Sequence, residues 1–331
     1  MAIRIGINGF GRIGRYFTRV ALENKEIEIV AINDLAPVET LAHLLKYDSV
    51  HGRYKGSVTS DAENIIANGK SIRITSHKNP AEIPWKDLGV DIVIESTGLF
   101  LKREQATAHL TAGAKKVILS APPASSDIKA IVMGVNDNIL DGSEDIISNA
   151  SCTTNSAAPL VAVMKKLGKI ESCYITTIHS YTTDQKLHDA PHKDLRRARA
   201  AAVSIVPTTT GAAKAITKIF PELEGHMGGC GMRVPVPDGS ITDMTFNMDH
   251  ELTVSEINLA FKLAAQQELK GIMDYTSDPI VSVDIIGSPY SATFDADLTS
   301  TIGKMIKVVS WYDNEAGYSN RLVDLVIKVG K

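Results

Sequence analysis

The sequence predicts an α/β protein that combines a doubly wound parallel sheet with a second α+β domain built on a mostly antiparallel sheet. The chain has 331 residues, a length that suits two domains better than one. In the first half, short apolar runs alternate with helical patterns, which favours a parallel sheet. In the second half, Met244, Phe246 and Met248 alternate with polar residues. That pattern is typical of a half-buried antiparallel strand.

The composition excludes several classes of protein. Hydrophobic residues make up 44% and charged residues 22% of the chain, so it can build full cores and is not disordered. The net charge of -3 does not attract nucleic acid or an anionic membrane. Cys152, Cys173 and Cys230 are too few and too far apart for a disulfide framework or a zinc site, and they fit a reducing compartment. We therefore expect a cytoplasmic protein with no signal peptide, no membrane span, no metal and no dedicated nucleic-acid partner.

The first predicted strand leads into a glycine-rich loop. Residues 2–7 form this strand, and the loop carries Gly9, Gly11 and Gly14. An amphipathic helix and a second strand over residues 27–32 follow, which is the context that a dinucleotide-binding Rossmann fingerprint requires. The three glycines would allow the tight turn, the approach of the pyrophosphate and close packing of helix on strand. The alternative is a tight structural turn.

Asp34 strengthens the fingerprint, because it lies twenty positions after Gly14, close to the spacing of a ribose-binding acid. A carboxylate accepts hydrogen bonds from a free 2′-hydroxyl and repels a 2′-phosphate, so the sequence favours NAD over NADP. The alternative is that Asp34 is a loop acid that caps the next helix.

Other polar residues also follow predicted strands. Further strands are predicted over residues 90–95, 117–119, 131–133 and 146–147, with a helix over 102–111. Ligands of such sheets bind beyond the carboxyl ends of the strands. Asp34, Thr97, Ser120 and the segment around Cys152 all fall at such ends.

Cys152 is the strongest candidate for a reactive side chain. It lies among small hydroxyl and amide residues (148–155), directly before an apolar helical run. A helix N-terminus favours the thiolate, which is the nucleophilic form. A nucleophilic thiol with a nicotinamide cofactor suggests oxidation of an aldehyde through a thioester. The alternative is a buried, inert cysteine.

The second half supplies a base and candidate anion sites. A strand predicted over residues 172–177 runs into His179, which would serve as base if it meets Cys152 and would otherwise be an ordinary buried histidine. Thr182, Arg197, Thr210 and Arg233 would suit phosphate oxygens. Helices are predicted over 212–219, 254–269 and 317–329, a strand over 306–312, and a polar stretch over 183–202.

These motifs together resemble the phosphorylating glyceraldehyde-3-phosphate dehydrogenase family. The resemblance runs from residues 5–14 to residues 311–319 and includes the segments around Cys152, His179, Thr210 and Arg233. It implies NAD-dependent conversion of D-glyceraldehyde 3-phosphate and inorganic phosphate to 1,3-bisphosphoglycerate in glycolysis and gluconeogenesis. The family also implies a homotetramer with residues 180–202 at a subunit interface.

The resemblance further implies roles for individual residues. Cys152 would form the thiohemiacetal and thioester, with His179 as base. Ser151, Thr153, Thr210 and Gly211 would contact the attacking phosphate, and Thr182, Arg197 and Arg233 the substrate's own phosphate. Positions that match cofactor contacts are Gly9, Gly11, Arg12, Ile13, Gly14, Asp34, Lys78, Ser120 and Asn314, and Tyr318 would flank the nicotinamide.

Some positions depart from the family pattern. Ser156 replaces a frequent second cysteine, Lys78 a frequent arginine, and Ala316 a frequent threonine. Asp238-Gly239 replaces a usual Asn-Val pair, and Ala190-Pro191 mixes features of NAD-dependent and NADP-tolerant members. None of these changes removes a predicted catalytic residue.

The expected domains are residues 1–150, which bind NAD, and 151–316, which carry the catalysis, with helix 317–331 packing back on the first. Two other functions stay open. One is an erythrose-4-phosphate dehydrogenase with the same chemistry, and the other is a non-catalytic NAD- or RNA-binding protein.

Overall fold

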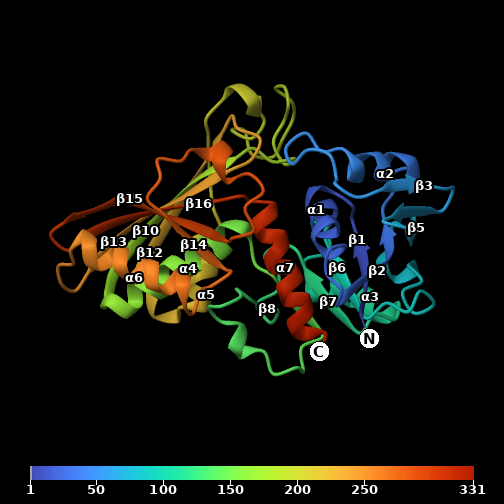
Figure 1. Ribbon diagram of the computed structural model, residues 1–331, viewed down its shortest axis with the longest axis horizontal. Helices are drawn as coiled ribbons and strands as arrows, with labels where there is room; N and C mark the ends of the chain where they lie inside the picture. Colours follow the sequence, from blue (N-terminus) through green and yellow to red (C-terminus); the bar gives the residue numbers. More distant parts are fainter. Residues whose placement is uncertain (1) are drawn as a thin grey trace. The chain divides into compact units, whose positions relative to one another are not determined.

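The computed structural model describes residues 2–331, which form two compact units (Figure 1). The first unit comprises residues 2–133, 137–151 and 319–331, and the second comprises Gly134–Asn136 and Cys152–Tyr318. Each contains one sheet, mostly parallel in the first and mostly antiparallel in the second, so the predicted fold class is confirmed. Within residues 2–331, no helix is both long and apolar enough to cross a membrane.

The sheet of the first unit has the strand order β3-β4-β5-β2-β1-β6-β7-β9-β8. The strands from β5 to β8 in this order pair in parallel, and β3 and β4 add an antiparallel edge. The bounds are β1 Ile3–Asn8, β2 Ile27–Asn33, β3 Val58–Ser60, β4 Asn64–Ala67, β5 Lys70–Thr75, β6 Ile92–Glu95, β7 Lys116–Leu119, β8 Lys129–Ala130 and β9 Ile146–Ser148.

Helices cover this sheet and complete its core. They are α1 (Arg12–Ala21), α2 (Val38–Lys46), α3 (Arg103–Thr111) and the part of α7 (Ala316–Val329) that belongs to this unit. Ile5 and Ile7 of β1 share one core with Phe17 of α1 and with Leu322 and Leu325 of α7. Residues from both ends of the described chain therefore build one apolar core.

The sheet of the second unit has the order β11-β12-β10-β13-β16-β15-β14. Helices α4, α5 and α6 pack against it (Figure 1). Met244, Phe246 and Met248 on β13 are fully buried, as their alternation predicts. The strands are β10 Ile170–Ser180, β11 Val206–Thr208, β12 Met227–Val234, β13 Ser240–Met248, β14 Met273–Thr276, β15 Ala292–Ile302 and β16 Met305–Tyr312; the helices are α4 Cys152–Leu167, α5 Ala212–Ile219 and α6 Val254–Gln266.

Some elements differ from the sequence prediction. The short strand expected over 131–133 lies at Lys129–Ala130, and α6 ends at Gln266, three residues early. Strand β12 has no sequence signal, because glycines at its centre lower β propensity. Its glycines allow close packing: a Cβ added at Gly228 would lie 2.7 Å from the ring of Tyr174.

Candidate active site

A tight turn places Cys152 at the first residue of helix α4. Strand β9 ends at Ser148, and the helix begins four residues later. Between them, Ala150 has a φ of 54°, a left-handed conformation that is uncommon for a residue with a side chain. The Ser148 hydroxyl holds the turn, because it accepts a 3.0 Å hydrogen bond from the Ala150 N–H and donates to the Ala121 carbonyl. The predicted position of Cys152 at a helix N-terminus is confirmed.

His179 meets Cys152 within the second unit. The Sγ atom of Cys152 lies 3.4 Å from Nε2 of His179. Parallel pairing of β10 with β12 places Arg233 beside His179, with one Arg233 nitrogen 2.5 Å from His179 Nδ1 and 3.0 Å from the Ser180 carbonyl oxygen. His179 Nδ1 also lies 2.7 Å from that oxygen, to which its N–H can donate, and this tautomer leaves Nε2 free to accept a proton. The structure thus brings three sequence-predicted residues into one cluster.

Burial and Arg233 set the protonation of this cluster. Burial, and then the charge of Arg233, lower the pKa of His179 to about 3, so the imidazole is neutral. Burial raises the pKa of Cys152, although Arg233 and the N–H of Thr153 oppose that effect. The expectation that the helix N-terminus gives a more acidic thiol is wrong for the free protein, because burial outweighs it. The pair is therefore a thiol beside a neutral imidazole.

Tyr312 is a neighbour of the cluster that sequence reasoning missed. Its hydroxyl lies 2.9 Å from the hydroxyls of both Thr153 and Thr177, and its ring packs edge-on to His179 with 5.9 Å between centroids. Burial raises the pKa of Tyr312, so the phenol stays protonated. The sequence does contain a signal for this residue, since a tyrosine at the end of a predicted buried strand, directly before Asp313, can direct its hydroxyl toward a site at the strand end.

Asn314 is fixed by two serine hydroxyls. Its Oδ1 accepts hydrogen bonds of 2.8 Å from Ser180 and 2.9 Å from Ser240. Both bonds are buried, and in this orientation of the amide its oxygen is directed toward the serines. Tyr318, at the start of α7, is also buried in the second unit.

The predicted phosphate contacts lie in the second unit, except Ser151, which is the last residue of the 137–151 segment of the first. Ser151 directly precedes α4, and Thr182 follows β10. Arg197 forms ion pairs with Asp184 and Asp194, and its charge is close enough to act on Arg233. At the start of α5, the Thr210 hydroxyl accepts a 3.2 Å hydrogen bond from the Ala212 N–H, which is the capping alternative, while the space around Gly211 is open.

A cavity of about 500 Å³ lies at the carboxyl ends of β1, β2 and β6 in the first unit. It is lined by Asn8, Gly9, Gly11, Asn33, Asp34, Leu35, His77, Lys78, Ser96, Thr97, Leu99 and Phe100. A Cβ at Gly14 would lie 2.4 Å from the Gly9 carbonyl oxygen, whereas one at Gly11 would meet nothing within 4 Å. The third glycine thus serves close packing and the second leaves open space, as the fingerprint requires.

Arg12, Ile13 and Ser120, which are also predicted to contact the cofactor, do not line this cavity. Arg12 and Ile13 begin α1, and a nitrogen of Arg12 lies 2.7 Å from a carboxylate oxygen of Asp48. The Ser120 N–H bonds the Glu95 carbonyl at the end of β6. Asp34 itself accepts hydrogen bonds from the Phe10 and Ala36 N–H groups, 2.7 and 3.0 Å long, which hold its carboxylate at the glycine loop.

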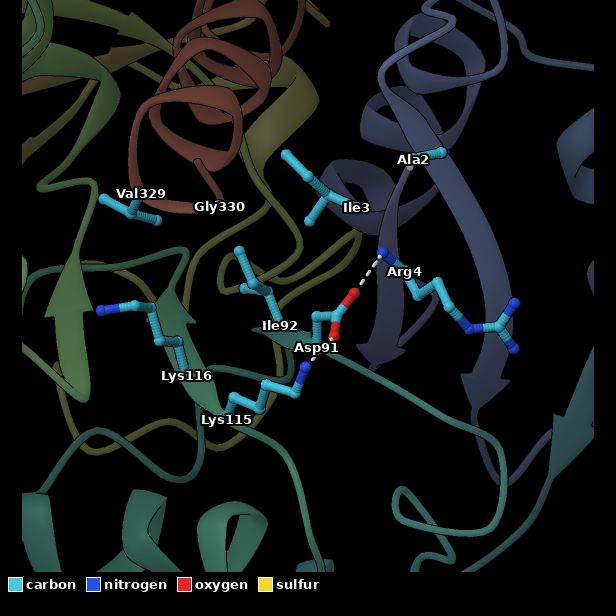
Figure 2. A pocket seen from close by; sticks show the side chains of 9 residues that line it. All are labelled: Ala2, Ile3, Arg4, Asp91, Ile92, Lys115, Lys116, Val329 and Gly330. Carbon is cyan, nitrogen blue, oxygen red and sulfur yellow. Dashed lines mark hydrogen bonds and ion pairs between the residues drawn. The ribbon is translucent and has the colours of Figure 1, made fainter.

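A second cavity, of about 420 Å³, lies at the opposite, amino-terminal edge of the parallel sheet (Figure 2). Asp91 stands at its centre, where it binds the Lys115 ammonium at 2.7 Å and the Arg4 N–H at 3.0 Å. It contains none of the predicted site residues. In parallel sheets, ligands bind at the other edge, so we assign no role in catalysis to this cavity.

Comparison with known proteins agrees with this geometry. Two family models match: the NAD-binding domain of glyceraldehyde 3-phosphate dehydrogenase over residues 3–103, and the C-terminal domain of the same enzyme over residues 151–314. Glyceraldehyde-3-phosphate dehydrogenase of Geobacillus stearothermophilus is 56% identical over 98% of this chain and 97% of its own. Glyceraldehyde-3-phosphate dehydrogenase 2 of Streptomyces avermitilis is 55% identical, and glyceraldehyde-3-phosphate dehydrogenase 1 of Bacillus subtilis 52%, each over 100% of this chain and 99% of its own. The chain belongs to the glyceraldehyde-3-phosphate dehydrogenase family.

Proposed function

We propose that this protein catalyses the oxidative phosphorylation of D-glyceraldehyde 3-phosphate to 1,3-bisphosphoglycerate, with NAD as cofactor and inorganic phosphate as second substrate. The observation that carries the proposal is the 3.4 Å contact between Cys152 Sγ and His179 Nε2 at a helix N-terminus, with Arg233 beside it. A binding protein that does not turn over substrate has no need of this arrangement.

Cys152 and His179 would share the proton transfers. The Cys152 sulfur attacks the aldehyde carbon, and the thiol proton passes through His179 to the aldehyde oxygen, which gives a thiohemiacetal. His179 then takes the hydroxyl proton as the carbonyl reforms, leaving a thioester. NAD, when bound, supplies the hydride acceptor for this oxidation. Phosphate oxygen finally attacks the thioester carbon, the C–S bond breaks, and the sulfur leaves to regenerate Cys152.

Two groups of side chains would hold the phosphates. Ser151, Thr153, Thr210 and Gly211 would bind the attacking phosphate, and Thr182, Arg197 and Arg233 that of the substrate. Support comes from the open space at Gly211 at the start of α5 and from the closeness of Arg197 and Arg233. Helix N-termini and arginine forks both suit phosphate oxygens.

The residues of the first unit fit NAD. We assign Gly9, Gly11, Arg12, Ile13, Gly14, Asp34, Lys78 and Ser120 to cofactor contacts, and we assign Asn314 and Tyr318 to the same role from the family resemblance. The Gly9–Gly14 packing and the cavity beside Asp34 support this assignment. With its oxygen toward the serines, Asn314 would offer its NH₂ group as a donor.

We further propose residues 1–150 as the NAD-binding domain and 151–316 as the catalytic domain, in a cytoplasmic homotetramer. Three free cysteines suit a reducing compartment. Leu187, Leu195 and Val203, in and beside the polar loop, are between 76% and 82% exposed in one chain. Apolar side chains gathered on one loop are typical of a protein interface.

The decisive experiment is NAD reduction followed by absorbance, with and without phosphate, on the wild type and Cys152→Ala. Steady turnover of glyceraldehyde 3-phosphate that needs both phosphate and Cys152 is expected. Turnover without phosphate would indicate thioester hydrolysis. Faster turnover of erythrose 4-phosphate would identify that sugar as the substrate. No turnover of either sugar would refute the proposal.

A further inference from the structure

Five buried polar side chains form a continuous hydrogen-bonded chain next to the cavity that Asp34 lines in the first unit. They are Trp85, His109, Glu95, Asn8 and Asn33, and we call them the buried polar network. Each is at most 4% exposed, and Glu95 and His109 are completely buried. Within residues 2–331, no lysine or arginine binds Glu95. A buried acid with no cationic side-chain partner needs a full set of other donors.

The direction of the hydrogen bonds is fixed on the asparagine side by the backbone of His77. The His77 N–H must donate, so the Asn33 atom 2.9 Å away is Oδ1, and Asn33 Nδ2 donates to the His77 carbonyl and to Asn8. The Asn8 atom that receives this bond is therefore Oδ1. Its Nδ2 then faces Glu95 and donates to Oε2 at 2.6 Å.

The direction is equally fixed on the histidine side. The Trp85 indole N–H can only donate, and it lies 3.0 Å from His109 Nδ1. Nδ1 must accept, so the ring proton is on Nε2, which lies 3.0 Å from Glu95 Oε2. His109 is therefore a neutral imidazole, since a second proton would face the indole N–H.

Thr97 completes the shell of Glu95. Its backbone N–H donates to Glu95 Oε1 at 2.8 Å, and its hydroxyl binds the same oxygen. Oε2 thus accepts from Asn8 and His109, and Oε1 accepts from the backbone N–H of Thr97, while the Thr97 hydroxyl can either donate or accept. The side-chain donors of the buried polar network run from Asn33 through Asn8, and from Trp85 through His109, and both runs end at Glu95.

The same network fixes two segments that line the cavity. Asn33 binds both the N–H and the carbonyl of His77, which directly precedes Lys78. Glu95 binds the N–H and hydroxyl of Thr97, and that hydroxyl accepts a 3.1 Å bond from the Leu99 N–H. Asn8 connects the two segments because it binds both Asn33 and Glu95.

We propose that the buried polar network is the positioning device of the cofactor cavity, with Glu95 and the Nε2–H tautomer of His109 holding the His77 and Thr97 segments in their NAD-binding positions. The proposal rests on the NAD-dependent function proposed above. Its residues act through the segments that they fix, and Glu95, His109 and Trp85 do not line the cavity.

The first test needs neither cofactor nor turnover. Nitrogen-15 NMR of histidine-labelled full-length protein reports the tautomer of His109, assigned by the signal lost in His109→Gln. We expect a proton on Nε2 and none on Nδ1, because Nδ1 accepts from the Trp85 indole N–H. A signal with the proton on Nδ1, or an imidazolium, would overturn the assignment.

The second test measures NAD affinity by calorimetry and steady-state kinetics. In Glu95→Gln the amide NH₂ must face a fixed donor on either side, so we expect NAD binding to weaken by roughly tenfold or more. The KM for NAD should rise similarly, while kcat at saturating NAD and the KM for the aldehyde change little. Glu104→Gln, on the exposed face of α3, is the matched control and should bind NAD as the wild type does.

If Glu95→Gln does not fold, the variant Trp85→Phe provides the test of the buried polar network. It removes the indole donor together with part of a buried ring that lies outside the cavity, so weaker NAD binding counts as support only together with a changed His109 tautomer. Wild-type NAD affinity in either folded variant would overturn it. If the wild type binds NAD and shows the expected tautomer without phosphate-dependent turnover, the proposed function fails and the network stands. A wild type that does not bind NAD would refute both.

Discussion

Cys152 Sγ and His179 Nε2 lie 3.4 Å apart, and both belong to the second unit. Strand β10 and helix α4 supply them from one compact body, so no rearrangement between units is needed to form the pair. Because His179 is held neutral and Cys152 protonated, proton transfer accompanies nucleophilic attack.

The reactivity of Cys152 should depend on pH as expected for a buried thiol. Burial raises its pKa and Arg233 lowers it, so alkylation of the free protein by iodoacetamide should keep increasing above pH 8. Arg233→Gln should move this rise to still higher pH. Mass spectrometry of the Cys152 peptide gives the rate, with the buried Cys173 peptide as internal control. A rate that levels off below pH 7 would show a standing thiolate and contradict the structure.

His179 should make the folded protein sensitive to acid. Its pKa falls from 6.5 to about 3 on folding, so between these values the unfolded chain binds the extra proton. The free energy of unfolding should therefore decrease as the pH falls from about 6.5 toward 3, by up to about 1.4 kcal/mol per pH unit from this residue. Denaturant unfolding of the cofactor-free protein measures the slope. His179→Asn should flatten it, and parallel curves for the two proteins would refute the assignment.

Asp238 should reduce the reactivity of the Cys152 thiol. It is buried, and its charge acts to raise the pKa of Cys152. Asp238→Asn, which restores the residue usual in the family, should lower that pKa and increase alkylation of Cys152 at pH 7 several-fold. The fully exposed Asp61→Asn serves as control. An unchanged rate in Asp238→Asn would show that the carboxyl is protonated or screened.

Gly14→Ala should damage the cofactor loop specifically. The new Cβ would lie 2.4 Å from the Gly9 carbonyl oxygen. Because the backbone sets the position of a Cβ atom, only a movement of the backbone could relieve this overlap. We expect NAD binding to weaken by about tenfold or more and stability to fall by about 1–3 kcal/mol. Gly11→Ala, whose Cβ meets nothing within 4 Å, is the control for stability. Calorimetry and thermal unfolding measure the two effects, and a Gly14→Ala protein as stable as the control would contradict the packing.

Asp34 should decide between the two nicotinamide cofactors. Asp34→Asn removes the charge that repels a 2′-phosphate, and it keeps an oxygen acceptor for only one of the Phe10 and Ala36 N–H groups, because each bonds a different oxygen of Asp34. The ratio of kcat/KM for NADP to that for NAD should rise by roughly tenfold, since removal of a repulsive charge changes specificity more than affinity. Steady-state kinetics with each cofactor measures the ratio. If it does not change, another group excludes NADP.

Local patterns were enough to predict the parallel sheet, the glycine loop and the position of Cys152. Each depends on residues close together in sequence, such as the alternation of Met244 and Phe246. The partnership of His179 with Arg233 could not be predicted from patterns, because it arises from pairing of β10 with a glycine-rich strand that has low β propensity. The net effect of burial on Cys152 was also missed, since desolvation depends on the whole fold.

The place of α7 in the first core has a consequence for how the chain is made. Leu322 and Leu325 fill the core around Ile5 and Phe17, yet they leave the ribosome only after the whole of the second unit. During most of translation, the apolar face of the first unit that α7 covers is therefore exposed. The segment Cys152–Tyr318, in contrast, can begin to fold as one continuous stretch of chain. We therefore expect the nascent chain to be prone to aggregation through this exposed face of the first unit, until α7 has been synthesised.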